Sequence, residues 1–99
     1  MTGYRISPEA EADLYRIWLY GLEKWGVVQA DRYYAAFFEQ FEKIAEQPYL
    51  YPTVDDIREG YRRSVCGVDS IYYRIENETV EIMAIIGRQD LDEWLEAGD

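Results

Sequence analysis

Residues 7–48 read SPEAEADLYRIWLYGLEKWGVVQADRYYAAFFEQFEKIAEQP and contain two consecutive amphipathic segments. Ser7 before Pro8 is typical of a helix N-cap followed by the first helical residue, and Gly26 is typical of a helix end. Pro48 cannot continue the second helix, because it lacks an amide proton. The short connection predicts an antiparallel helical hairpin. Apolar residues recur every three or four positions, at Ala10, Leu14, Ile17, Gly21 and Trp25 and then at Ala30, Tyr33, Tyr34, Phe37, Phe38, Phe41, Ile44 and Ala45.

The chain on either side of the helices is typical of strands. Residues 4–6 alternate briefly, and three extended runs at 60–66, 69–76 and 79–86 are separated by two-residue turns, which predicts an antiparallel meander. Residues 89–96 place apolar side chains at helical steps and predict a short C-terminal helix. The order predicts an α+β fold, in which an N-terminal strand precedes a helical hairpin packed on a small antiparallel sheet. The length of 99 residues predicts a single domain, residues 1–99.

Period-two alternation predicts the two faces of the sheet. In the last run, Val80, Ile82, Ala84 and Ile86 are expected on one face and Met83 and Ile85 on the other. Because the helices cover one face only, we expect Tyr72, Met83 and Ile85 to expose apolar area on the other face and to bind a partner there.

Composition excludes several kinds of chemistry. The chain has 20 acidic and 10 basic residues, a net charge of −10 and no histidine, so it contains neither a histidine-based catalytic triad nor a histidine metal ligand. The single cysteine, Cys66, forms no internal disulfide and fits a reducing compartment. With no basic, apolar leader and no apolar run near 18 residues, we expect a cytoplasmic protein without a membrane span. We expect no metal and no cofactor.

Cap, core and turn residues follow one another in a recognisable joint order along nearly the whole chain. They are Tyr4 to Ala10, Asp13, Leu14, Ile17, Tyr20, Trp25, Gly26, Gln29, Ala30, Tyr33, Ala45, Pro48, Gly60 to Arg63, Tyr72 to Ile75 and Val80 to Ile82. This order resembles the ParE branch of the RelE/ParE toxin superfamily. The resemblance implies the toxin of a type II toxin–antitoxin module of the plasmid-stabilisation kind, which traps the cleaved-DNA complex of DNA gyrase and is neutralised by a ParD-like antitoxin. It also implies that operator DNA is bound by the antitoxin, so we expect no direct sequence-specific nucleic-acid binding by this chain.

The same superfamily contains RelE-like ribosome-dependent mRNA endoribonucleases, which are the alternative. Such an enzyme needs clustered cations and a tyrosine, histidine or glutamate as acid or base. This chain has two lysines, and residues 87–99 hold one arginine against five acids. The composition therefore favours a protein-binding inhibitor without catalytic residues, while a scaffold domain without toxicity is a third interpretation.

Four arginines, Arg58, Arg62, Arg63 and Arg74, are clustered in a segment that holds only two acids. Arg62 and Arg63 are adjacent on a strand and point to opposite faces, so only one of them shares a face with Arg74. These arginines either pair with Glu76, Glu78 or Glu81, or join Arg88 in a patch that contacts the target or an acidic antitoxin segment.

The C-terminal segment offers further candidates. Relatives often show His-Gln-Arg or His-Gly-Arg where this chain has Gly87-Arg88-Gln89, so Arg88 is retained and the histidine is missing. Trp94 and Leu95 either contact the target or close the edge of the sheet core. Toxins of the superfamily are commonly neutral or basic, whereas this chain is acidic. We therefore expect antitoxin binding to rest mainly on apolar burial.

Overall fold

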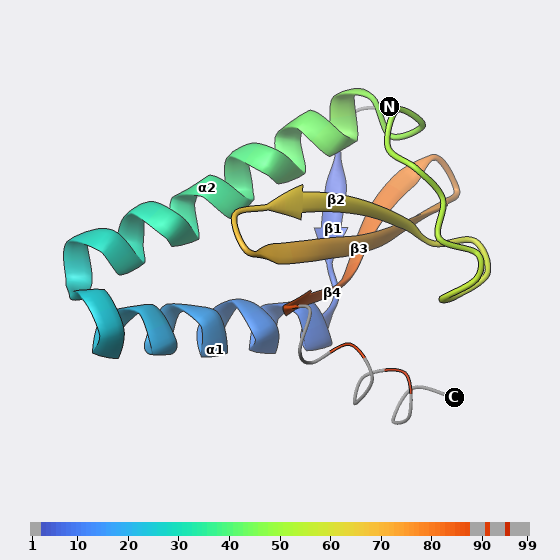
Figure 1. The fold of residues 1–99 in the computed structure, drawn as a ribbon. Coiled ribbons are helices and arrows are strands. Elements are labelled where there is room, and N and C mark those ends of the chain that lie inside the picture. The colour runs from blue at the N-terminus through green and yellow to red at the C-terminus, as the bar shows by residue number, and fades with distance from the viewer. Residues whose placement is uncertain (1–2, 88–90, 92–94, 96–99) are drawn as a thin grey trace.

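The computed structural model describes residues 3–87, Leu91 and Leu95. The elements are β1 (Tyr4–Ile6), α1 (Pro8–Trp25), α2 (Val27–Glu46), β2 (Arg62–Cys66), β3 (Asp69–Glu76) and β4 (Thr79–Gly87), which confirms the predicted α+β fold (Figure 1). The four strands form one sheet in the order β1-β4-β3-β2. β2, β3 and β4 are antiparallel, as predicted, but β1 pairs with β4 in parallel, so the sheet is mixed. The two helices and the β2–β3 hairpin supply the long connection that a parallel pair requires.

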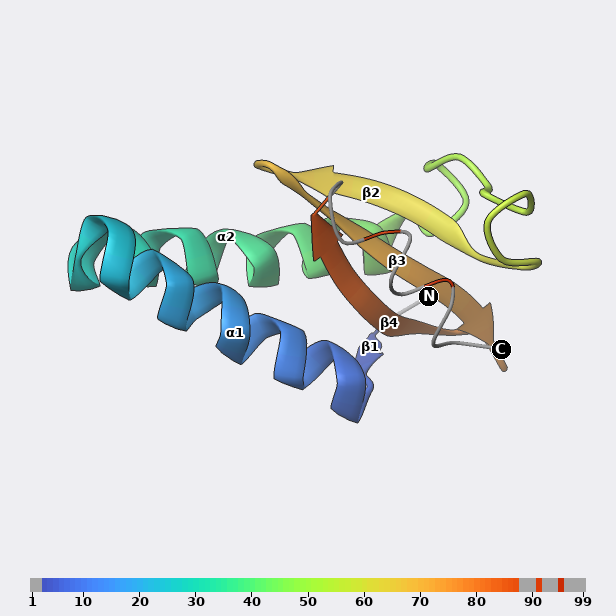
Figure 2. The ribbon, with the colours of Figure 1, turned by 60° about the horizontal axis from the view of Figure 1, so that its bottom comes forward.

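Both helices lie on one side of the sheet and diverge from a tight turn (Figures 1 and 2). Ser7 caps α1, since its side chain accepts the amide proton of Ala10 at 3.0 Å, and Pro8 occupies the first turn. Gly26 is the only residue between the two helices and has a φ of +92°. Glycine adopts a positive φ at little cost, so the chain can reverse direction at this single residue. Neither helix is long and apolar enough to span a membrane, within the residues that the structure describes.

The main core lies between the helices and the sheet. Tyr73 is fully buried there, and its hydroxyl donates to the carbonyl of Pro48 at 2.7 Å, which ties the end of α2 to the middle of β3. Truncating a ring at such a position typically removes about 3–5 kcal/mol of stability. The buried members are Ala10, Leu14, Ile17, Phe37, Phe41, Ile44, Ile71, Tyr73, Val80, Ile82 and Ile85.

A β-bulge at Met83 exchanges the faces of β4. Tyr72 pairs with Ala84 and Tyr73 pairs with Ile82, so Met83 is the extra residue between them. Ile85 therefore joins the core under the helices, whereas Ala84 and Ile86 point to the opposite face. The predicted alternation along β4 is thus wrong beyond Ile82, because one extra residue inverts every later side chain.

The first turns of α1 fix this bulge. The Ser7 amide donates to the carbonyl of Ile82 at 2.9 Å, and the Ser7 hydroxyl donates to that of Met83 at 3.1 Å. Farther along, Asp13 accepts the amide proton of Ile85 at 3.0 Å, and Arg16 donates to the carbonyl of Ile85 at 3.3 Å. Since β1 pairs only as far as Ile82, these side chains take the place of a strand neighbour along the rest of β4.

A second, smaller cluster covers the sheet face that the prediction left open. Tyr72 is 2% exposed and Ile85 is 0% exposed, so the expectation that both present apolar area to a partner is wrong. Ile85 lies under the helices because of the bulge, and the connector before β2 folds over Tyr72. Met83 is half-buried. The second cluster consists of Val54, Tyr72, Ala84 and Ile86, with Ile57, Tyr61 and Leu91 packed against them.

Candidate functional site

Arg62 is engaged within the fold. It lies opposite Tyr73, on the helix side of β2. Its guanidinium donates to the carbonyl of Tyr51 at 2.6 Å and to that of Tyr49 at 3.3 Å, and it lies 5.2 Å from the centre of the Tyr49 ring. These contacts hold the connector against the edge of the sheet. Arg58, in the connector, is half-buried.

Arg63 is the strand arginine that shares a face with Arg74, because it lies opposite Tyr72. Arg74 is paired with Glu81 at 2.9 Å and with Glu76 at 3.1 Å, and the hydrogen bond that Arg74 donates to Glu81 raises the pKa of Arg74. Glu81 in turn lies 3.9 Å from Arg5 of β1. Arg63 makes no ion pair with any residue in the described part of the chain. The arginine cluster is therefore mostly engaged in pairing within the chain, and Arg63 is its available charge.

Arg88 and Trp94 lie outside the described residues, as does most of the predicted C-terminal helix. Of that segment, Leu91 packs against the second cluster and Leu95 is 36% exposed; both residues are helical. The two interpretations of Trp94 and Leu95, contact with the target or closure of the sheet core, both stay predictions.

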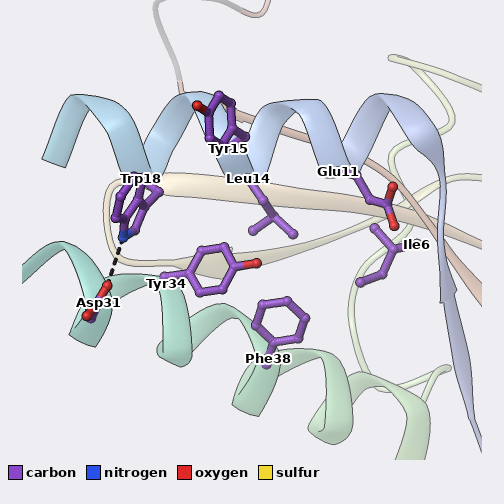
Figure 3. A pocket seen from close by; sticks show the side chains of 8 residues that line it. All are labelled: Ile6, Glu11, Leu14, Tyr15, Trp18, Asp31, Tyr34 and Phe38. Atoms are coloured by element: carbon purple, nitrogen blue, oxygen red, sulfur yellow. Dashed lines mark hydrogen bonds between the residues drawn. The ribbon is translucent and has the colours of Figure 1, made fainter. Parts of the chain in front are cut away.

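The structure also contains a groove between α1 and α2 that the sequence analysis did not single out. It has a volume of about 480 Å³ and opens between the facing sides of the two helices (Figure 3). Trp18 reaches across from α1, and its indole Nε1 donates to Asp31 Oδ1 of α2 at 2.8 Å. Tyr15 is 61% exposed and Tyr34 is 39% exposed. The lining side chains are Ile6, Glu11, Leu14, Tyr15, Trp18, Asp31, Tyr34 and Phe38.

The rings of the groove are held by one another. Tyr15 stacks on Trp18 with ring centres 6.4 Å apart, and Tyr34 meets Phe38 at 5.1 Å. Each pair is separated by three or four residues on its own helix, the spacing at which side chains meet on a helix surface. The groove is therefore largely formed before any partner arrives. It offers a helix or an extended chain an apolar floor with hydrogen-bonding groups at its rim.

Both charged side chains that line the groove, Glu11 and Asp31, are acidic. Figure 3 shows Asp31 beneath Trp18 at one end and Glu11 beside Ile6 at the other, with Tyr34 between them. Sequence analysis missed Tyr15 and Trp18 and assigned Tyr34 to the core. The signal that could have found them is the second stripe of α1, where Glu11, Tyr15 and Trp18 follow at steps of four and three beside the core stripe.

A shallower hollow of about 380 Å³ lies near the helix turn, lined in part by Trp25, Arg32, Tyr33 and Val68. The Tyr33 hydroxyl is 2.9 Å from Asp69 Oδ2 and accepts the Val68 amide proton at 3.2 Å, and burial together with Asp69 raises the pKa of Tyr33. A Cβ on Gly67 would lie 2.5 Å from the Tyr33 ring, so only glycine fits this turn. Tyr33 thus packs the β2–β3 turn onto α2.

The described residues offer little for metal or nucleophile chemistry. No group of three or more histidine, cysteine or acidic side chains that could hold a metal ion occurs among residues 3–87, Leu91 and Leu95. Burial, with a smaller contribution from Asp69, raises the pKa of the Cys66 thiol. A raised pKa disfavours the thiolate, which is the nucleophilic form.

Comparison with known proteins gives a consistent set of matches. Residues 4–91 match the family model described as "ParE toxin of type II toxin-antitoxin system, parDE". "Toxin ParE1" of Caulobacter vibrioides is 38% identical over 86 residues, covering 87% of this chain and 88% of that protein. "Toxin ParE1" of Mycobacterium tuberculosis is 33% identical over 91 residues, covering 90% and 93%. A solved chain from "Chromosomal ParDE TA system from P. aeruginosa" superposes with a TM-score of 0.78 at 18% identity, over 88% of this chain and 96% of that one.

Proposed function

The chain belongs to the ParE family of type II toxins, and on that premise we propose that it arrests growth by binding DNA gyrase and trapping its cleaved-DNA complex. A ParD-like antitoxin neutralises it. The chain acts in the cytoplasm as a protein-binding inhibitor and catalyses no reaction itself.

The groove between α1 and α2 carries the antitoxin part of this proposal. Its rings are already positioned, and two of them, Tyr15 and Tyr34, are exposed to solvent. An apolar groove between helices suits an amphipathic helix, which buries one stripe of side chains in it. The sheet face opposite the helices is a weaker candidate for this binding site, because the second cluster covers its apolar side chains. An antitoxin helix in the groove therefore buries apolar area without displacing any part of this chain.

The target part follows from charge and from family membership. A net charge of −10 disfavours binding to the phosphates of ribosomal RNA. Arg63 is available on the sheet face, away from the groove. We assign the target contact to this side of the molecule, with Arg88 as a further candidate, so that target and antitoxin use different surfaces.

Induced expression in a bacterial host tests the proposal. We expect arrested replication with double-strand DNA breaks, rescue by a gyrase variant resistant to trapping, and rescue by coexpression of the adjacent ParD-like gene. Inhibited translation with mRNA cleavage would contradict gyrase trapping and support the ribonuclease alternative. Growth without inhibition, from a chain shown to be folded, would contradict a toxin of either kind.

A further inference from the structure

The groove between α1 and α2 combines aromatic faces with carboxylates. Trp18, Tyr15 and Tyr34 present rings to it, and Glu11 and Asp31 are its charged groups. Aromatic faces and carboxylates share one preference, since both attract a cation. An uncharged apolar helix would use the rings and leave the carboxylates without a cation.

Asp31 is the better placed of the two carboxylates. Its Oδ1 accepts the indole proton of Trp18 at 2.8 Å, which holds the carboxylate at the end of the groove beside the Trp18 ring (Figure 3). Its Oδ2 has no partner among the described residues. An arginine or lysine entering this end of the groove meets a fixed acceptor and an aromatic face together. Such a pair loses little side-chain entropy on the toxin's side, because Asp31 and Trp18 already hold each other.

Glu11 marks the opposite end of the groove. On α1 it lies seven residues before Trp18, roughly 10 Å at the rise of an α-helix. A helix lying along the groove therefore passes both carboxylates, with its apolar stripe over Tyr34 and Phe38 between them.

We propose that the partner of this groove is an amphipathic helix carrying an arginine or lysine beside its apolar stripe, and that this cation binds the Asp31 carboxylate at Oδ2, beside the Trp18 ring. The inference rests on the proposed role of the groove as the antitoxin site, and adds the chemistry of the occupant. It also fits an acidic toxin, since one buried cation complements the groove while apolar burial supplies most of the affinity.

A selection that needs no knowledge of the antitoxin tests this proposal. A phage library of amphipathic helical peptides is selected against the immobilised full chain and, in parallel, against Asp31→Asn. The amide oxygen of asparagine still accepts the Trp18 proton, so this variant removes the charge and keeps the ring in place. We expect arginine or lysine to be enriched at one position beside the apolar stripe on the natural chain and not on the variant.

The enriched peptide is then compared with a copy in which citrulline, a neutral analogue of similar shape, replaces the arginine. Its affinity should fall about tenfold, the size of one partly desolvated cation–π and carboxylate contact. Glu39→Gln makes the same change of charge on an exposed part of α2 outside the groove lining, and it should leave the affinity unchanged.

Binders without a preferred cation, equal enrichment on Asp31→Asn, or no binders at all would each overturn the inference. Growth arrest and gyrase trapping in cells are separate readouts. If the chain poisons gyrase and an antitoxin neutralises it while no cation is selected, only the inference fails. If cationic peptides are selected but gyrase is unaffected, the proposed target fails and the inference stands.

Discussion

The sheet face opposite the helices and the groove between the helices are built from similar residues, aromatic rings with charges around them. On the sheet face, Tyr72 is covered by the connector, and Arg74 is paired with two glutamates. In the groove, Tyr15 and Tyr34 remain accessible, and both lining charges are acidic. The first surface is completed by its own chain, whereas the second keeps its rings accessible. Residue type alone does not mark a binding site; what matters is whether the fold itself satisfies those residues.

Truncating Tyr72, whose ring is covered by the connector, should have the largest effect on stability. Tyr72→Ala removes a side chain that is 2% exposed, and we expect the free energy of unfolding to fall by about 3 kcal/mol or more. Urea denaturation followed by circular dichroism measures it. A loss below about 1 kcal/mol, typical of a surface site, would show that this face is open after all.

Alkaline pH should lower the free energy of unfolding, because it ionises the buried phenol of Tyr73. Burial raises the pKa of Tyr73 to about 12, with Arg62 opposing, so the folded state favours the neutral phenol. Its contribution is fully present below the unfolded pKa of about 10 and is lost as the pH rises through 12, up to about 2–3 kcal/mol. Urea titrations between pH 9 and pH 12 should show a shallower decline for Tyr73→Phe than for the natural chain. Parallel declines would contradict this assignment.

Truncating an accessible ring should separate binding from stability. Tyr34→Ala should weaken antitoxin binding by about 2 kcal/mol, roughly thirtyfold, as for a hot-spot residue, and change the free energy of unfolding by less than about 1 kcal/mol. Calorimetry with the purified antitoxin measures the first quantity and urea denaturation the second. Tyr49→Ala, which truncates a tyrosine that is 67% exposed on the connector, is the matched control and should bind normally. Equal losses for both variants would place the antitoxin elsewhere.

The bulge at Met83, which exchanges the faces of β4, should depend on Ser7. Ser7→Ala removes the cap of α1 and the hydrogen bond to Met83 together, and the expected loss of stability is about 1–2 kcal/mol. Ser7→Thr, which keeps the hydroxyl, should retain most of it. Hydrogen exchange at the Ile85 amide should speed up in the alanine variant only. Unchanged exchange there would mean that Ser7 does not fix the bulge.

The smallest effect should come from the ion pair on the sheet face. Arg74 is partly exposed, so a double-mutant cycle between Arg74 and Glu81 should give a coupling below about 1 kcal/mol that decreases with salt. Arg63→Ala should change stability by less than about 0.5 kcal/mol. Growth inhibition is then measured for Arg63→Ala alone and for Arg63→Ala combined with Arg88→Ala. If inhibition survived in both variants, the target would not bind these arginines.

The elements of the fold could be predicted from local signals, and the faces of β4 could not. Pro8, Gly26 and Pro48 act through backbone geometry at their own positions, and the Ser7 side chain caps the adjacent turn, so the helix bounds follow from residue type. The bulge at Met83 depends on Ser7, far away in sequence, and a period-two pattern contains no sign of it. Because this contact is so distant in sequence, the pattern along β4 alone predicted the wrong face for Ile85.

Some features of the candidate site could likewise be predicted from the sequence, and others could not. The pattern correctly indicated that Arg62 and Arg63 point to different faces, but it could not say which one the connector would engage. The groove was missed because Tyr34 fits the core stripe of α2, while Tyr15 and Trp18 lie beside the core stripe of α1. The two helices diverge from the turn between them (Figure 1), and the groove opens between those side chains.

The hydrogen bond from the Ser7 hydroxyl to Met83 also bears on the order of events during synthesis, since 76 positions separate the two residues. On a ribosome, the start of α1 is made long before the strand that anchors it, and β1 must wait for the same strand. The final arrangement of this chain therefore forms only after nearly all of it has emerged. Such distant pairings slow folding relative to a helical protein of equal length. A newly made molecule thus spends an interval in which neither the sheet face nor the groove is a finished surface.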